Sequence, residues 1–199
     1  MVIQGITYFS SIQTFKRNQL MGLAAATYQN DLTVDTAKWF AVLTRVKAEK
    51  SVCQTLTTAG ITNYVPLQRV TRIYTRKRRT SMVPLIYRYI FVHIKKNEYV
   101  RVLETPNVEG FVRFNKQIIS IPDQEIEWLQ RVTGEVNDIT LENQPFSEGD
   151  AVEVVLGNLT GLKGKLIESL SKHELLIELD HIGFGLRIQI DPSHLRKLR

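Results

Sequence analysis

The sequence is poor in cysteine and in long apolar runs. Among its 199 residues there is one cysteine, Cys53, which excludes an intramolecular disulfide and is typical of a reducing compartment. A membrane-spanning helix needs about 20 consecutive apolar residues, and no run approaches that length. The apolar stretch after Lys16 and Arg17 is too short for a signal peptide. These absences indicate a cytoplasmic protein with no membrane span.

Groups of side chains able to perform catalysis are also missing. The four histidines have no ligand-like spacing with one another or with Cys53, which argues against a zinc site. Cys53 lies on the apolar face of a predicted helix, so we interpret it as a core thiol rather than a nucleophile. The segment GNLTGLKGK (157–165) lacks the Gly-Lys-Ser/Thr ending of a phosphate-binding loop. We therefore predict a binding protein without catalytic residues, metal or cofactor.

What the sequence does contain is positive charge concentrated in one region. The formal net charge is +6, whereas residues 38–116 carry 16 Lys and Arg against 4 Asp and Glu, a difference of +12. The stretch RVTRIYTRKRR (69–79) holds six of these cations and no acid. Clustered cations gain free energy by displacing counterions from nucleic acid, so the stretch predicts contact with a polyanion. A solvated hairpin arm is the alternative interpretation.

Periodicity predicts a leader followed by an α+β domain. Residues 1–37 have no sustained pattern and are expected to form a flexible leader. From 38 to 134, strand and helix patterns alternate, which predicts a compact α+β domain. Helices are expected over 47–60, 97–105 and from about 122 onward. The residues expected to face inward on these helices are Val52, Leu56, Val100, Leu103, Ile126, Leu129 and Val132.

The rest of the chain predicts a linker and a second domain. Residues 135–146 are polar and acidic, as in a linker. Residues 147–199 contain short strand patterns separated by turn signals, with Gly157, Gly161 and Gly164 where tight turns are needed. A segment of this length can form only a small, strongly curved sheet or barrel.

The stretch VPLIYRYIFVHI (83–94) is apolar on both faces when it is placed in a strand. With RVTRIYT (69–75) it is expected to form a hairpin that carries RKRR (76–79) at its tip. One face should pack on the domain's own helices, and the other should be covered by the second domain or by a partner protein, because large aromatic patches seldom stay bare. A strand buried on both sides within the core is the alternative.

Five segments resemble, in order, the NusG family of transcription elongation factors. They are KWFAVLTRVKAEKSVCQTL, VPLIYRYIFVHI, TPNVEGFVRF, IPDQEIEWL and GDAVEVVLGNLTGLKGKLIES, which together cover about 38–199. FVRF and the VPL…YIFV pattern are most similar to the specialised paralogues, RfaH and the UpxY-like antiterminators. The resemblance implies an amino-terminal antiparallel sheet with helices, joined by a linker to a small KOW (SH3-like) β-barrel at 147–199.

The resemblance also implies a function and its residues. Family members bind the β′ clamp helices of RNA polymerase and suppress pausing and termination, here for a specific operon such as one for capsular polysaccharide. By position, the polymerase-binding residues would be Trp39, Phe40, Leu85, Ile86, Tyr87, Tyr89 and Phe91. Arg45, Lys47 and Lys50 would face the non-template DNA strand or nascent RNA. The charge pattern adds the hairpin cations Arg76, Lys77, Arg78 and Arg79 to this nucleic-acid-binding set.

One position departs from the family pattern. Where members commonly have Pro-Gly or Pro-Asn before a conserved Tyr, this chain has Tyr87-Arg88, which is expected to straighten the strand. The KOW domain would bind a ribosomal protein or Rho, and the protein would act as a monomer. Two other functions stay open at this point: a general NusG factor acting with Rho, and a ribosome- or RNA-binding KOW protein.

Overall fold

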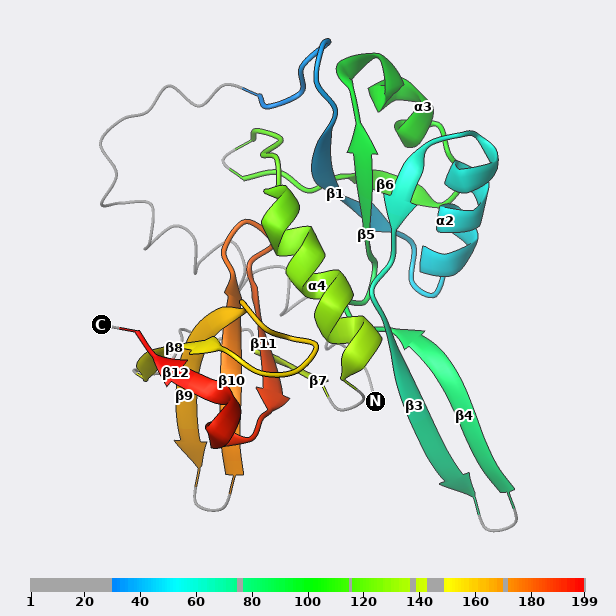
Figure 1. The fold of residues 1–199 in the computed structure, drawn as a ribbon. Helices are drawn as coiled ribbons and strands as arrows, with labels where there is room; N and C mark the ends of the chain where they lie inside the picture. Colours follow the sequence, from blue (N-terminus) through cyan, green and yellow to red (C-terminus); the bar gives the residue numbers. More distant parts are fainter. Residues whose placement is uncertain are drawn as a thin grey trace. The chain divides into compact units, whose positions relative to one another are not determined.

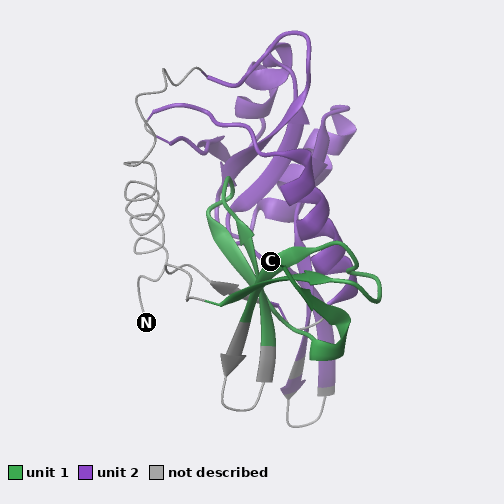
Figure 2. Cartoon of the chain, turned by 60° about the vertical axis from the view of Figure 1, so that its left-hand side comes forward, with its two compact units in different colours: residues 1–28, 140–199 green, residues 29–139 purple. Residues whose placement is uncertain are grey.

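The chain divides into two compact units. The computed structural model describes residues 30–74, 77–114, 116–136, 139–142, 149–169 and 172–198. We call residues 29–139 the amino-terminal unit, and we call residues 140–199, grouped with 1–28, the carboxy-terminal unit (Figure 2). No helix among the described residues is long and apolar enough to cross a membrane.

The end of the predicted leader belongs to the amino-terminal unit. The Asp31 carboxylate accepts hydrogen bonds from the backbone N–H (2.8 Å) and the hydroxyl (3.0 Å) of Ser120. Leu32 packs against the hydrophobic core. Residues 1–29 lie outside the described part of the chain. The boundary expected at residue 37 is therefore too late, because a polar side chain and an apolar one already attach the preceding segment to the unit.

A four-stranded antiparallel sheet is the centre of the amino-terminal unit. Its order is β2-β5-β1-β6, and its strands are β1 (Lys38–Thr44), β2 (Thr62–Tyr64), β5 (Tyr89–Ile94) and β6 (Val108–Phe111). β1 and β5 are the two central strands, and Ala41 pairs with Phe91 and Val42 with Ile90 (Figure 1). Since successive side chains alternate between faces, Tyr89 and Phe91 lie on one face and Ile90 and Val92 on the other.

One face of the sheet carries the main hydrophobic core. The core includes Phe40, Val42, Val52, Leu56, Ile90, Val92, Val102 and Phe111. Its cover comes from α2 (Glu49–Thr58) and α3 (Tyr99–Leu103), which follows the 3-10 turn η1 (Lys96–Glu98). The inward positions Val52 and Leu56 are confirmed for α2. The inward positions Val100 and Leu103 are wrong for α3, since they are 55% and 36% exposed. Val102 is buried instead, and Tyr99, three residues earlier, packs against the core.

Helix α4 (Asp123–Glu135) covers the second face of the sheet. Ile126, Leu129 and Val132 are buried along it, as the helical pattern predicted. The helix contacts β1, and its Thr133 hydroxyl lies 2.7 Å from the Tyr64 hydroxyl at the sheet edge (Figure 1). The second face is therefore covered within the amino-terminal unit: the expectation of cover by another domain or a partner is wrong, and the alternative of a strand buried on both sides is correct.

The predicted hairpin is present, but its second arm is not continuous with the central strand. β3 (Leu67–Tyr74) and β4 (Lys77–Pro84) form a separate two-stranded sheet. In its register Thr71 pairs with Thr80, and their hydroxyls lie 3.0 Å apart. Residues 85–88 then form a bend and turn before β5 begins. The alternation expected over 83–94 is wrong, because this break resets which face each side chain occupies.

The carboxy-terminal unit contains a six-stranded sheet in the order β12-β8-β9-β10-β11-β7. The strands are β7 (Ile139–Glu142), β8 (Asp150–Val154), β9 (Lys163–Ser169), β10 (Lys172–Leu179), β11 (Phe184–Gln189) and β12 (Leu195–Lys197), with the 3-10 turn η2 (Pro192–His194) before the last. β7 falls within the predicted linker 135–146, so that interpretation is corrected. Its pattern Ile-Thr-Leu-Glu alternates as a strand should. The small-barrel class of this sheet stays a prediction.

Three glycines have distinct positions near β8 and β9. Gly157 (φ +82°) and Gly161 (φ +86°) lie between the two strands in the left-handed region, which glycine occupies without a steric cost. Gly164 instead lies inside β9. A Cβ added there would be 2.3 Å from the carbonyl oxygen of Leu176 on β10, so the close approach of two backbones requires glycine.

Replacing Gly164 by Ala is expected to destabilise the protein by about 1–3 kcal/mol, because the added Cβ has no room beside Leu176. The matched control is Gly134→Ala in α4, where nothing lies within 4 Å of the added atom. That change should stabilise the helix by about 0.5 kcal/mol, since alanine loses less backbone entropy than glycine. Urea denaturation of both variants measures the difference. Equal stabilities would contradict the close packing of β9 on β10.

Candidate functional site

The aromatic residues expected to form a docking patch are mostly in the interior. Phe91 is 0% exposed and stacks on Tyr64 with ring centroids 6.3 Å apart, while Tyr89 is 7% exposed. Burial raises the pKa of the Tyr89 hydroxyl to about 12, and nearby Arg88 opposes part of that rise. Phe40 is also 0% exposed, on the opposite face, with its ring edge toward Phe111. The aromatic side chains that were expected to be exposed on this face are therefore buried.

The other members of the predicted patch differ in exposure. Leu85 and Ile86 are each 2% exposed, and Trp39 is half-buried with its ring 5.0 Å from that of His93. Tyr87 is 68% exposed. Of the seven residues, Tyr87 is thus the large side chain that a partner can reach directly.

Tyr87 lies where three connecting segments of the amino-terminal unit meet. We call this region, residues 44–50, 85–88 and 107–109, the junction. The Thr44 N–H donates to the Arg88 carbonyl oxygen at 2.8 Å. The Arg45 N–H donates to the Asn107 carbonyl oxygen at 2.9 Å. These bonds join the β1–α2 loop to the turns that precede β5 and β6.

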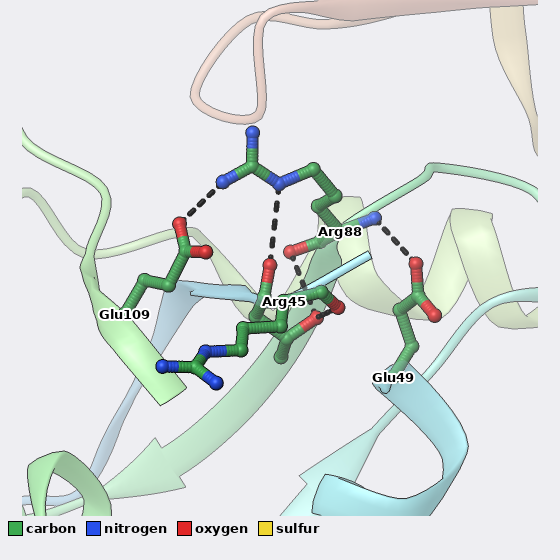
Figure 3. Close-up of polar contacts among 5 residues, drawn as sticks. Arg45, Glu49, Arg88 and Glu109 are labelled. Atoms are coloured by element: carbon green, nitrogen blue, oxygen red, sulfur yellow. Dashed lines mark hydrogen bonds and ion pairs between the residues drawn. The ribbon is translucent and has the colours of Figure 1, made fainter. Parts of the chain in front are cut away.

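Arg88 is the centre of the junction. It adopts φ +69°, a left-handed conformation that is uncommon for a residue with a Cβ. Its N–H donates to the Glu49 carboxylate at 2.7 Å, its Nε donates to the Thr44 carbonyl oxygen at 3.2 Å, and its guanidinium pairs with Glu109 (Figure 3). The expectation that Tyr87-Arg88 straightens the strand is wrong, because these contacts hold a tight turn without Pro or Gly.

Sequence reasoning missed the two acids that hold Arg88. Glu49 is 2% exposed at the start of α2, and Glu109 lies on β6. A signal was available, since residues 38–116 contain only four acids among 16 cations and two of the four contact Arg88. A buried carboxylate must have hydrogen-bond partners, so the Arg88 N–H makes the burial of Glu49 tolerable.

The predicted nucleic-acid-binding cations fall into two groups. Arg45 and Lys47 are exposed in the β1–α2 loop beside Val46, which is 65% exposed. Lys50, at the start of α2, donates to the Met82 carbonyl oxygen and so joins the junction to β4. Arg45, Val46, Lys47 and Tyr87 therefore give the junction a surface that is both apolar and cationic.

The second group of cations lies on the β3–β4 hairpin. Arg78 and Arg79 are exposed on β4. Arg76 lies outside the described residues, as does the side chain of Lys77, although its backbone is part of β4. Of the four predicted hairpin cations, Arg78 and Arg79 are therefore the two whose side chains the structure describes.

The structure offers no reactive or metal-binding group in the part of the chain it describes. No cluster of three or more His, Cys, Asp or Glu side chains there could hold a metal ion. Cys53 lies on the buried face of α2, within the core. Burial, and secondarily the charge of Glu49, raises the pKa of its thiol to about 12, which suppresses the thiolate that a nucleophile requires.

Comparison with known families gives a match over most of the amino-terminal unit. Residues 37–130 match the family model described as transcription termination factor nusG. Over these residues the chain is similar to the NusG family. Members of the NusG family are transcription factors rather than enzymes. The matched residues contain the sheet, helices α2 and α3, the hairpin and the whole junction.

Solved structures give a second comparison. The structure described as "Domain interaction in Thermotoga maritima NusG" is 22% identical, with a TM-score of 0.50, and the match covers 82% of this chain and 98% of that one. At this identity the likeness to NusG concerns the fold. Two conformations of the MjSpt4:Spt5 complex also match, with identities of 18% and 20%, TM-scores of 0.28 and 0.29, and coverage of 80% of this chain and 97% and 96% of theirs. The search of curated proteins gave no match.

The turn at Arg88 can be tested with two substitutions. Arg88→Ala and Arg88→Gly both remove the contacts to Glu109 and Thr44, but only alanine keeps a Cβ at positive φ. We expect the glycine variant to be more stable than the alanine variant by about 1 kcal/mol. Thermal or urea denaturation measures this difference. If the alanine variant were at least as stable as the glycine variant, the backbone at position 88 would not be in the left-handed conformation.

The reactivity of Cys53 tests its burial. With a thiol pKa of about 12, only about one thiol in ten thousand is ionised at pH 8 in the folded chain. A disulfide reagent should therefore react slowly at pH 8 and rapidly in denaturing urea. Because folding raises this pKa, the associated stability is complete below the unfolded pKa and is lost as pH rises toward 12. Fast labelling of folded protein at pH 8 would refute the core assignment.

Proposed function

We propose that this chain is a NusG-type transcription elongation factor that binds RNA polymerase and suppresses pausing and termination. The observation that carries the proposal is the similarity of residues 37–130 to the NusG family. Within it, the junction offers an exposed aromatic side chain, Tyr87, next to Val46, Arg45 and Lys47. Aromatic residues are favoured as interface anchors, and flanking cations speed the encounter with an acidic partner.

In this proposal Tyr87 and Val46 contact the β′ clamp helices of the polymerase. Five members of the patch that the sequence predicted are buried and so do not contact the partner in this conformation: Phe40, Leu85, Ile86, Tyr89 and Phe91. Removing the Phe91 ring would leave a core cavity that costs about 3–5 kcal/mol. Substitution of Phe91 would therefore test folding rather than docking.

The exposed cations contact nucleic acid beside the docked polymerase. Arg45 and Lys47 at the junction and Arg78 and Arg79 on the hairpin are all exposed. Such cations contribute sequence-independent, salt-sensitive binding to the phosphates of the non-template DNA strand or of nascent RNA.

The finer assignment is operon-specific antitermination, as for capsular polysaccharide genes. It is supported by the similarity of FVRF and VPL…YIFV to the specialised paralogues. The carboxy-terminal unit, with strands β8–β12, is proposed as a KOW domain that recruits a ribosomal protein or Rho. No feature of the described residues favours a general Rho-dependent factor or a ribosome-binding protein over this function.

Docking can be tested with Tyr87→Ala in the full chain. We expect binding to purified RNA polymerase to weaken at least about tenfold, as for an interface anchor, and pause suppression in single-round transcription to weaken with it. Leu156→Ala is the matched control, because Leu156 is 54% exposed but lies in the carboxy-terminal unit. It should bind polymerase as the unmodified chain does. Failure of the unmodified chain to bind polymerase would refute the proposed function.

A further inference from the structure

A small basic pocket lies in the amino-terminal unit at the far end of the central strands from the junction. β5 runs toward α3 (Figure 1), and Lys96, which follows the end of β5, is one of the residues that line the pocket. It has a volume of about 190 Å³. The side chains that define its chemistry are Leu32, Lys96, Tyr99, Arg113, Lys116 and Ile118.

Backbone hydrogen bonds connect the three segments that line the pocket. The Lys96 N–H donates to the Thr33 carbonyl oxygen at 2.8 Å, and the Asp31 N–H donates to the Ile118 carbonyl oxygen at 3.1 Å. Ile118 is 3% exposed and belongs to the core, against which Leu32 also packs. The pocket therefore has an apolar floor and a defined backbone frame.

The charge of the pocket is not neutralised by the residues around it. Lys96, Arg113 and Lys116 line it without any acid among the lining residues. The two nearby acids have other contacts, since the Asp31 carboxylate binds Ser120 and the Glu98 carboxylate accepts the Lys95 N–H at 3.0 Å. Within the described residues none of the three cations has an ion pair. Three converging cations in one small concavity favour an anion.

Tyr99 determines what kind of anion fits. Its ring stacks on Phe111, with centroids 4.8 Å apart and an angle of 25° between the rings, and packs against the core. Its hydroxyl accepts a weak hydrogen bond from the Arg113 guanidinium at 3.4 Å. One face of the Tyr99 ring is therefore occupied by Phe111, and Tyr99 is the one aromatic ring among the lining residues. The cations of the pocket suit a phosphate better than the partly occupied ring suits a nucleobase.

The volume indicates that only part of the ligand enters. Pockets that enclose whole small molecules measure about 300–1,000 Å³, and this one is smaller. We propose that the pocket binds a backbone phosphate of a nucleic-acid strand through Lys96, Arg113 and Lys116, without reading the base sequence. This site is separate from the junction and the hairpin, and it does not depend on polymerase binding.

The test measures binding of a fluorescent single-stranded 12-nucleotide oligothymidylate to the full chain by anisotropy. In Arg113→Gln with Lys116→Gln we expect affinity to fall about tenfold and the slope of log K against log salt to decrease by about 1.4, the value for two lost contacts. The matched control is Lys163→Gln with Arg196→Gln, which removes the same charge from the carboxy-terminal unit. It should change neither affinity nor slope by a comparable amount.

Three results would overturn the proposal: an unchanged affinity in the pocket variant, an equal loss of affinity in the control, or a dependence on base sequence that the pocket variant loses.

Inorganic pyrophosphate is the second probe. We expect it to compete weakly with the oligonucleotide, and tighter binding of pyrophosphate would instead assign the pocket to a free phosphate ligand. Lys96→Gln provides a single-charge variant if the double variant does not fold. Polymerase binding should be unaffected in all of them, so failure here differs from failure of the proposed function.

Discussion

The N–H of Arg88 donates to the buried carboxylate of Glu49, and the arrangement of the amino-terminal unit depends on this contact. It couples the start of α2 to the residue before β5 and holds a non-glycine residue at positive φ. The turn sets the register in which Tyr89 pairs with Leu43. Side chains alternate along β5 from Tyr89 onward, whereas Tyr87 lies before the strand in the turn and is exposed, while Tyr89 and Phe91 are buried.

The covered second face of the sheet changes where binding can occur. With α4 on one side and α2 and α3 on the other, the central strands contribute few exposed side chains. The exposed side chains that could bind a partner therefore lie in the loops at the ends of the strands. At one end the junction combines Tyr87 and Val46 with cations, and at the other three cations surround a small pocket. Connecting loops on a rigid sheet commonly carry function in this way.

The two units differ in how far acidic side chains pair with their basic side chains. In the carboxy-terminal unit, basic side chains pair with acids, as Arg187 does with Glu174 and Lys165 with Glu178. In the described part of the amino-terminal unit, Glu49 and Glu109 contact Arg88, while the pocket cations Lys96, Arg113 and Lys116 have no acid among the residues that line the pocket with them. A protein that acts on a polyanion needs such a separation, because an internal ion pair would compete with phosphate.

The sequence alone determined the features that depend on local pattern. The periodicity of α2 and α4, the strand character of β1 and β5, the hairpin and the excess of cations over 38–116 are all read from neighbouring residues. Contacts distant in the chain decided the rest. Glu49 meets Arg88 across 39 positions and Tyr64 meets Thr133 across 69, so neither the retained turn nor the cover over Phe91 can be read from either segment. The exposure of a side chain is a property of what packs on it, and only the tertiary structure supplies that.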